Sequence, residues 1–221
     1  MTSHSVLVFV HIVLFCLWLG MDIGVYYAGK FTTREDLSRK ERLHFLELLA
    51  LLDMGPRTAL VLMVAVGAQL GANLGLIPLG STALGVIWLI DLAWLGLVWW
   101  QFLSPQHPQV QLMARVDYAI RYAVIGVFML VGLYAIFTDT LISGAWLRLK
   151  LVFFGTVVSI GLILRATLPP WLAALSKLDD LTTAAQAQQT IQAVYRFSGR
   201  WAHGLWALVV IMAFLGTTKP F

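Results

Sequence analysis

Apolar residues occur along this chain in six long runs that are separated by short polar segments. Because about 20 consecutive apolar residues are enough to cross a bilayer as a helix, each run can form a transmembrane span. The pattern therefore predicts an all-α membrane protein: a bundle of about six transmembrane helices that forms one domain over residues 1–221. The expected spans are 5–28, 57–78, 82–103, 118–137, 146–167 and 200–217.

Two further segments have helical character without being apolar enough to span. Residues 38–53 are followed by Met54-Gly55-Pro56, and proline disfavours helix at and just before its own position. This segment is therefore either a cytoplasmic amphipathic helix or the lower part of a kinked span. Residues 178–196 follow Pro169-Pro170, which we expect to end the fifth helix, and they predict an amphipathic surface helix or docking element.

The amino-acid composition indicates that most of the protein surface faces lipid and not water. Of its 221 residues, 60% are hydrophobic and 12% are charged, whereas a soluble domain carries about a quarter charged residues. The chain has too little polar surface to face water, so its main partner is the lipid bilayer. The net charge of +4 does not indicate nucleic-acid binding, because the basic residues lie in loops at helix ends. Cys16 is the only cysteine, which excludes an intramolecular disulfide and a cysteine-based zinc site.

The distribution of Lys and Arg predicts the orientation of the bundle. Cytoplasmic loops of membrane proteins carry an excess of these residues. The opposite side of this chain has few of them, namely Arg148, Lys150 and Lys219. We therefore expect both termini in the periplasm and the protein in the cytoplasmic (inner) membrane of a bacterium. The loops and loop ends on the predicted inner side hold Lys30, Arg34, Arg39, Lys40, Arg42, Arg115, Arg121, Arg165, Lys177, Arg196 and Arg200.

The first span carries ionisable residues, which are costly in lipid and are therefore functional candidates. At about 100° per residue, the spacings of 7 and 11 residues place His4, His11, Trp18 and Asp22 on one stripe of the helix. This stripe must face the bundle interior or a cofactor. Two interpretations of His11 stay open at this point: a ligand, or a buried histidine hydrogen-bonded to a neighbouring helix.

Other polar residues lie in or near the spans. Arg148 and Lys150 open the fifth helix, where either could also reach the headgroups as an interfacial anchor. Asp91 lies in the middle of the third span, and its alternative to function is a structural hydrogen bond to Ser or Thr. The remaining candidates are His203 and His44 near the inner face. His107 is expected to be solvated in a loop, and Asp53 with Arg57 to form a structural i,i+4 ion pair.

Three short motifs carry a resemblance to a known family. The first helix reads His11-Ile-Val-Leu-Phe-Cys-Leu-Trp18-Leu-Gly20, and the fifth opens Gly144-Ala-Trp146-Leu147-Arg148-Leu149-Lys150-Leu151. The chain ends Lys219-Pro220-Phe221. These motifs resemble those of the HemJ-type protoporphyrinogen IX oxidases and the broader CopD-like membrane superfamily. The chain departs from the family in having Arg148 where the motif has His, and Met21-Asp22 where a Pro-Arg pair stands.

The resemblance implies a haem b cofactor, with His11 as an axial ligand and Lys150 as a catalytic residue. Haem propionates are anionic, so Arg148 and Lys150 on the outer side would pair with them. His11 and His203 would be roughly 16 Å apart along the membrane normal, too far to share one iron. One haem would therefore use His11 with His4 or another helix, beside Trp18. A second, inner haem would use His44 and His203.

The leading functional hypothesis is thus a haem-b-binding membrane protein with a redox role. That role would be porphyrinogen oxidation or electron transfer across the membrane to a partner protein, by a single chain or a homo-oligomer. One alternative is a CopD-like copper permease, although the seven methionines form no repeated pair. Another is a cofactor-free structural or assembly subunit of a larger membrane complex.

Overall fold

The computed structural model describes residues 3–180 and 182–220, and all of its regular elements in these ranges are helices. Six helical stretches are long and apolar enough to cross a membrane, the fifth of them formed by α5 and α6 together. The predicted six-helix membrane bundle is therefore confirmed. The helices are α1 (Ser3–Thr32), α2 (Arg39–Asn73), α3 (Ser81–Leu103), α4 (Val110–Thr138), α5 (Ala145–Ala166), α6 (Leu168–Leu175) and α7 (Ala184–Thr218).

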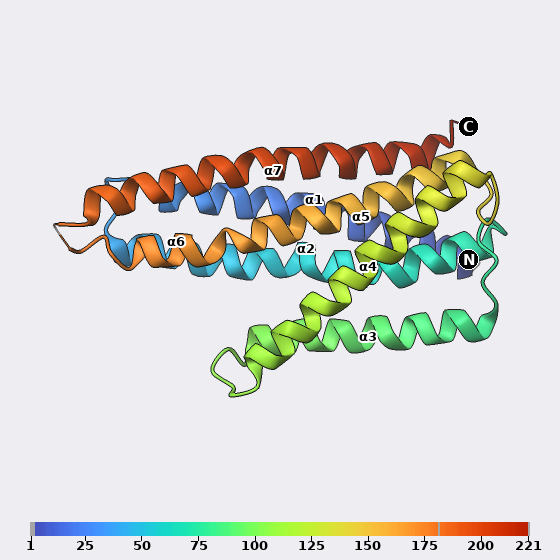
Figure 1. Cartoon of the computed structure of the whole chain (residues 1–221), viewed down its shortest axis with the longest axis horizontal. Helices are drawn as coiled ribbons and strands as arrows, with labels where there is room; N and C mark the ends of the chain where they lie inside the picture. The colour runs from blue at the N-terminus through green and yellow to red at the C-terminus, as the bar shows by residue number, and fades with distance from the viewer. Residues whose placement is uncertain (1–2, 181, 221) are drawn as a thin grey trace.

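The beginning of α1 and the end of α7 lie at the same end of the bundle (Figure 1). This is the arrangement that an even number of spans requires. The long helices alternate in direction, and the link 104–109 and residues 176–180 lie at the opposite end from the termini (Figure 1). The periplasmic location of that end stays a prediction from the positions of Lys and Arg.

Four helices, α1, α2, α5 and α7, form the centre of the bundle. The closest packing partners along the chain are α1 with α2 and α4 with α5, and α7 packs on α5, α6 and α1. Helix α3 packs on α2, and α4 runs obliquely from the end of α3 to the start of α5 (Figure 1). This oblique course matters because it carries polar residues of α4 towards the bundle interior.

The described residues form two hydrophobic cores. The larger one lies within the membrane-spanning part and includes Trp18 of α1, Met54 of α2 and Phe154 of α5. The smaller one joins α2, α6 and α7 around Leu46, Trp171 and Ile191. Since lipid offers no hydrophobic drive between helices, the larger core depends on close van der Waals packing.

Helix α2 is continuous from Arg39 to Asn73, so residues 38–53 form the first part of the second span and not a separate helix. A capping box starts it: the Glu41 amide donates to Ser38 Oγ at 3.3 Å, and the Ser38 amide donates to Glu41 Oε2 at 2.8 Å. Pro56 lies inside the helix. At Gly55 a side chain would collide with Met21, so tight packing on α1 holds the helix together through the proline. The helix ends earlier than the predicted residue 78.

Of the predicted segment 178–196, residues 184–196 form the start of α7, which continues without a break into the last span, and residue 181 lies outside the described residues. Pro169 and Pro170 do end α5, but they also open the short helix α6, where proline is compatible with the first turn. Gln188 of α7 accepts a 2.6 Å hydrogen bond from Arg42 and donates one of 2.8 Å to the Thr33 carbonyl. The segment is thus docked on the α1–α2 connection.

The α1–α2 connection carries its own ion pair. The Arg34 guanidinium donates hydrogen bonds to the Asp36 carboxylate. This interaction lowers the pKa of the Asp36 carboxyl below its ordinary value.

Candidate functional site

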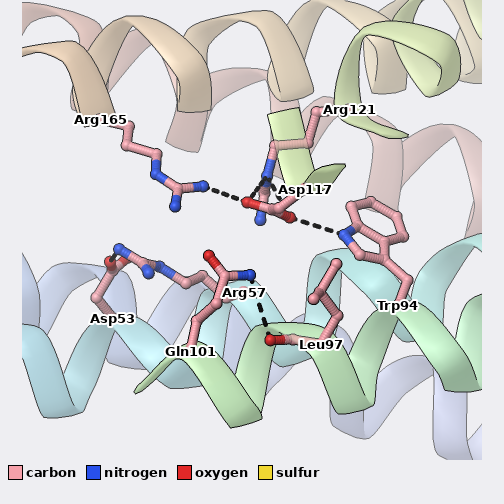
Figure 2. A network of polar contacts seen from close by, with 8 residues as sticks. All are labelled: Asp53, Arg57, Trp94, Leu97, Gln101, Asp117, Arg121 and Arg165. Atoms are coloured by element: carbon pink, nitrogen blue, oxygen red, sulfur yellow. Dashed lines mark hydrogen bonds and ion pairs between the residues drawn. The ribbon is translucent and has the colours of Figure 1, made fainter. Parts of the chain in front are cut away.

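The strongest polar arrangement in the bundle is centred on Asp117 of α4. Its Oδ1 accepts a 2.8 Å hydrogen bond from Trp94 Nε1 of α3. Arg121 Nε, one helical turn further along α4, lies 3.1 Å from both carboxylate oxygens, and Arg165 at the end of α5 donates to Oδ2. Figure 2 shows that these donors approach one carboxylate from three helices.

Burial makes this cluster costly to disrupt. Asp117 is 1% exposed and Arg121 is 5% exposed. A charge taken out of water is tolerated only when it is paired and hydrogen-bonded. Asp117 therefore compensates two guanidinium groups, and it ties α3, α4 and α5 together.

A second ion pair, between Asp53 and Arg57, extends this polar region on α2. The sequence predicted this i,i+4 pair, and the structure confirms it. Arg57 and Arg165 lie close enough to Arg121 to interact with it electrostatically. Figure 2 places the α2 pair opposite the Asp117 cluster, across the space between α2 and α4.

A cavity of about 170 Å³ adjoins both ion pairs. Arg57, Arg121 and Arg165 form its cationic wall, and Asp22 of α1 lines it as well. Asp22 accepts a 2.6 Å hydrogen bond from Trp206 Nε1 of α7 and lies within electrostatic range of Asp53. The rest of the lining is mainly apolar and aromatic, and includes Trp18, Tyr26, Val157, Trp171, Tyr195 and Leu205.

The predicted stripe on α1 divides between two environments. Trp18 is buried in the larger core and lines the cavity, as Asp22 does. His11 lies nearer the termini and is outside the cavity lining. Its Nδ1 is buried and has no hydrogen-bond partner among the described residues. His4, further towards the end of the helix, is half-buried.

Lys150 and Arg148 differ in their surroundings although both open α5. Lys150 Nζ lies 6.0 Å from the centre of the Trp146 ring and next to Gly216 of α7, and it is close enough to His11 to interact electrostatically. Arg148 instead donates a 2.8 Å hydrogen bond from Nε to the Ile142 carbonyl and forms an ion pair with Asp139. Of the two cations, Lys150 is therefore the one associated with His11.

The two histidines predicted to share an inner haem have different surroundings. His44 is exposed on α2. His203 Nδ1 lies 2.5 Å from the Gly199 carbonyl oxygen, and its ring contacts Tyr26 and Trp206. In the part of the chain that the structure describes, no hydrogen bond or ring contact joins His203 to His44. Nor does any group of three or more His, Cys, Asp or Glu residues there form a metal site.

For Asp91 of α3 the sequence left a structural hydrogen bond to Ser or Thr open as the alternative to a functional role, and the described residues show no such bond. The side chain is 2% exposed, and neither carboxylate oxygen has a hydrogen-bond partner among the described residues. His107 is exposed in the link between α3 and α4, as predicted; its Nδ1 accepts a 3.2 Å hydrogen bond from the Gln109 amide, and its ring contacts Trp100.

Sequence reasoning missed the Asp117 cluster. It treated Arg121 and Arg165 as markers of loop ends. The available signal was the i,i+4 spacing of Asp117 and Arg121 at the edge of an apolar run, the same spacing that identified Asp53 and Arg57.

Comparison with known proteins adds no family assignment. No protein-family model, curated protein or solved structure matches this chain.

Proposed function

We propose that this chain is a haem-b-binding integral membrane protein with a redox role, with His11 as an axial ligand. The role would be electron transfer to a partner protein or porphyrinogen oxidation. The proposal includes a location in a bacterial inner membrane with both termini in the periplasm. The resemblance of the His11 and Lys150 motifs to the HemJ-type oxidases first suggested this role.

The observation that carries the proposal is the buried His11 Nδ1 without a hydrogen-bond partner. A buried polar atom normally has a partner, because leaving it unpaired costs about 1–3 kcal/mol. In a helix that faces lipid, the cost of an unpaired polar group is expected to be at least as large. An iron atom bound at Nδ1 itself would remove this cost, so the residue fits an axial ligand that binds through this nitrogen.

The neighbouring residues suit the same group. Bound haem b would carry one electron as its iron cycles between the ferric and ferrous states. Lys150, within electrostatic range of His11, would hold a propionate or an anionic substrate. Arg148 is engaged with Ile142 and Asp139, which favours a structural role for it over propionate binding.

The alternatives receive less support. The arrangement of His44 and His203 does not favour a second haem. A copper permease would present methionines along a pore, whereas Met54 and Met212 are buried in the larger hydrophobic core. A cofactor-free subunit would leave the His11 nitrogen unpaired.

An absorption spectrum tests the proposal. The protein is expressed with 5-aminolevulinate as a haem precursor and purified in detergent. Spectra are then recorded before and after dithionite reduction. We expect a Soret band and the sharp α band of reduced b-type haem, with no loss in the His107→Ala variant and complete loss in the His11→Gly variant.

Addition of imidazole controls for misfolding of the His11→Gly variant. If His11 is an iron ligand, imidazole should restore the haem spectrum by replacing the missing ring. A folded protein that lacks a Soret band despite an adequate haem supply would contradict the proposal. So would equal haem content in the His11 and His107 variants.

A further inference from the structure

The cavity beside the Asp117 cluster is a second candidate site, separate from His11. It is lined by residues of α1, α2, α4, α5, α6 and α7, and its lining combines guanidinium groups with aromatic rings. A buried cluster that served stability alone would need no cavity on its charged side, because its members already pair with one another.

The charges on the cavity wall favour an anion. Three guanidinium groups, Arg57, Arg121 and Arg165, face two paired carboxylates, Asp53 and Asp117. These five groups leave one positive charge over, and the ionised carboxylate of Asp22, which also lines the cavity, offsets it, so the attraction for an anion is local to Arg57 and Arg165. Asp22 stands apart from these pairs and accepts from Trp206, so its carboxylate opposes a bound anion without neutralising an arginine directly.

Two of the three arginines are available to a ligand. The Arg57 and Arg165 side chains are 29% and 21% exposed, whereas Arg121 is 6% exposed. A guanidinium group has five N–H donors, and the ion pairs with Asp53 and Asp117 use only part of this capacity. A planar guanidinium recognises a carboxylate through two parallel hydrogen bonds.

The volume of the cavity and its apolar walls limit the size and the chemistry of the ligand. The cavity has a volume of about 170 Å³, and an engineered cavity of about 150 Å³ is known to hold benzene. Trp18, Val157, Trp171 and Leu205 offer apolar surface for a body of this size.

We propose that this cavity binds a small organic acid, a carboxylate attached to an apolar body about as large as a benzene ring. The carboxylate is held by Arg57 and Arg165. The apolar body lies against Trp18, Val157 and Leu205. Asp22 weakens binding by repulsion.

Calorimetric titration of the purified, delipidated protein in detergent tests this site. The probe is benzoate, and its neutral counterpart of the same shape, benzamide, is the matched ligand control. We expect benzoate to bind and benzamide to bind at least about tenfold more weakly, which corresponds to 1.4 kcal/mol. Phosphatidylglycerol is added in a separate competition to test a lipid headgroup as the occupant.

Charge variants locate the bound anion. Arg165→Gln and Arg57→Gln should each weaken benzoate binding about tenfold or more. Arg200→Gln, which changes an exposed arginine of α7 outside the cavity lining, should leave it unchanged. Asp22→Asn keeps an oxygen that accepts from Trp206 but removes the negative charge, so it should tighten binding.

Three results would overturn the proposal. They are equal affinities for benzoate and benzamide, equal effects of Arg165→Gln and Arg200→Gln, and binding of phosphatidylglycerol without binding of benzoate. A folded protein that binds neither probe would show that the cavity holds water only. The haem spectrum is measured separately, so failure of this proposal and failure of the proposed redox function remain distinguishable.

Discussion

Trp94 Nε1 of α3 donates a 2.8 Å hydrogen bond to Oδ1 of Asp117 on α4, and this bond joins the two outer helices to the charged cluster. The Trp94 ring also lies 5.5 Å from the Arg121 guanidinium. The donor and the ring thus act together on one buried ion pair. Because α3 otherwise packs mainly on α2, this contact helps to fix α4 in its oblique position.

Trp94→Phe should therefore destabilise the protein while keeping an aromatic ring in place. Hydrogen bonds to charged groups contribute about 1.5–3 kcal/mol, and we expect a loss in this range. Thermal unfolding in detergent, followed by circular dichroism, measures it. Trp99→Phe is the matched control, since Trp99 is partly exposed and its 3.1 Å bond goes to the Thr58 hydroxyl. Equal losses in the two variants would show that the Asp117 bond has no special weight.

Removing the aspartate charge should destabilise the protein more in the Asp117 cluster than in the Asp53–Arg57 pair. Asp117→Asn leaves Arg121 and Arg165 without their counter-ion, and breaking a buried pair in this way costs about 3–5 kcal/mol. Asp53→Asn affects one arginine in a partly exposed pair, for which we expect about 1 kcal/mol or less. Denaturation in mixed micelles compares the two. A smaller loss for Asp117→Asn than for Asp53→Asn would contradict the assignment of Asp117 as the centre of the cluster.

The sequence was sufficient to predict the number and alternation of the spans, because lipid forces every spanning segment to be apolar and helical. It was less informative about where helices end. α2 continues through Pro56 because Gly55 allows α1 to approach closely at Met21, and this contact depends on the tertiary structure.

Some residues of the candidate sites could be predicted from the sequence, and others could not. Position along an apolar helix was enough to single out His11 and Asp22. Arg121 and Arg165 were interpreted as loop markers because sequence alone does not show that Asp117 neutralises them inside the bundle. The cavity could not be predicted at all, since it is formed by side chains from helices far apart in the chain.

Substitution of Asp91 should raise the stability of the protein, whereas the substitutions of Trp94, Asp117 and Asp53 should lower it. Its carboxylate is buried in α3 without a hydrogen-bond partner among the described residues. Asp91→Asn keeps the shape of the side chain and removes the need to bury a negative charge, so we expect a stabilisation of about 1 kcal/mol or more. Thermal unfolding of the two proteins in the same detergent measures the difference. A loss of stability would mean that the carboxylate is satisfied by a cation or another bound group.

Lys150 and Arg148 should separate function from stability. Lys150→Met keeps the apolar stem but removes the cation near His11. It should lower haem retention or the haem reduction potential, because a positive charge favours the reduced iron, and it should change the unfolding temperature little.

Arg148→Met should instead lower the unfolding temperature and change haem retention and reduction potential little. Its hydrogen bond to the Ile142 carbonyl and its pairing with Asp139 secure the loop before α5, and their loss should cost about 1–2 kcal/mol. Haem content, redox titration and thermal unfolding, measured on both variants, give this crossed pattern. If Lys150→Met matches the unaltered protein in haem content and potential, Lys150 is an interfacial anchor and the cation beside His11 has no part in the redox site.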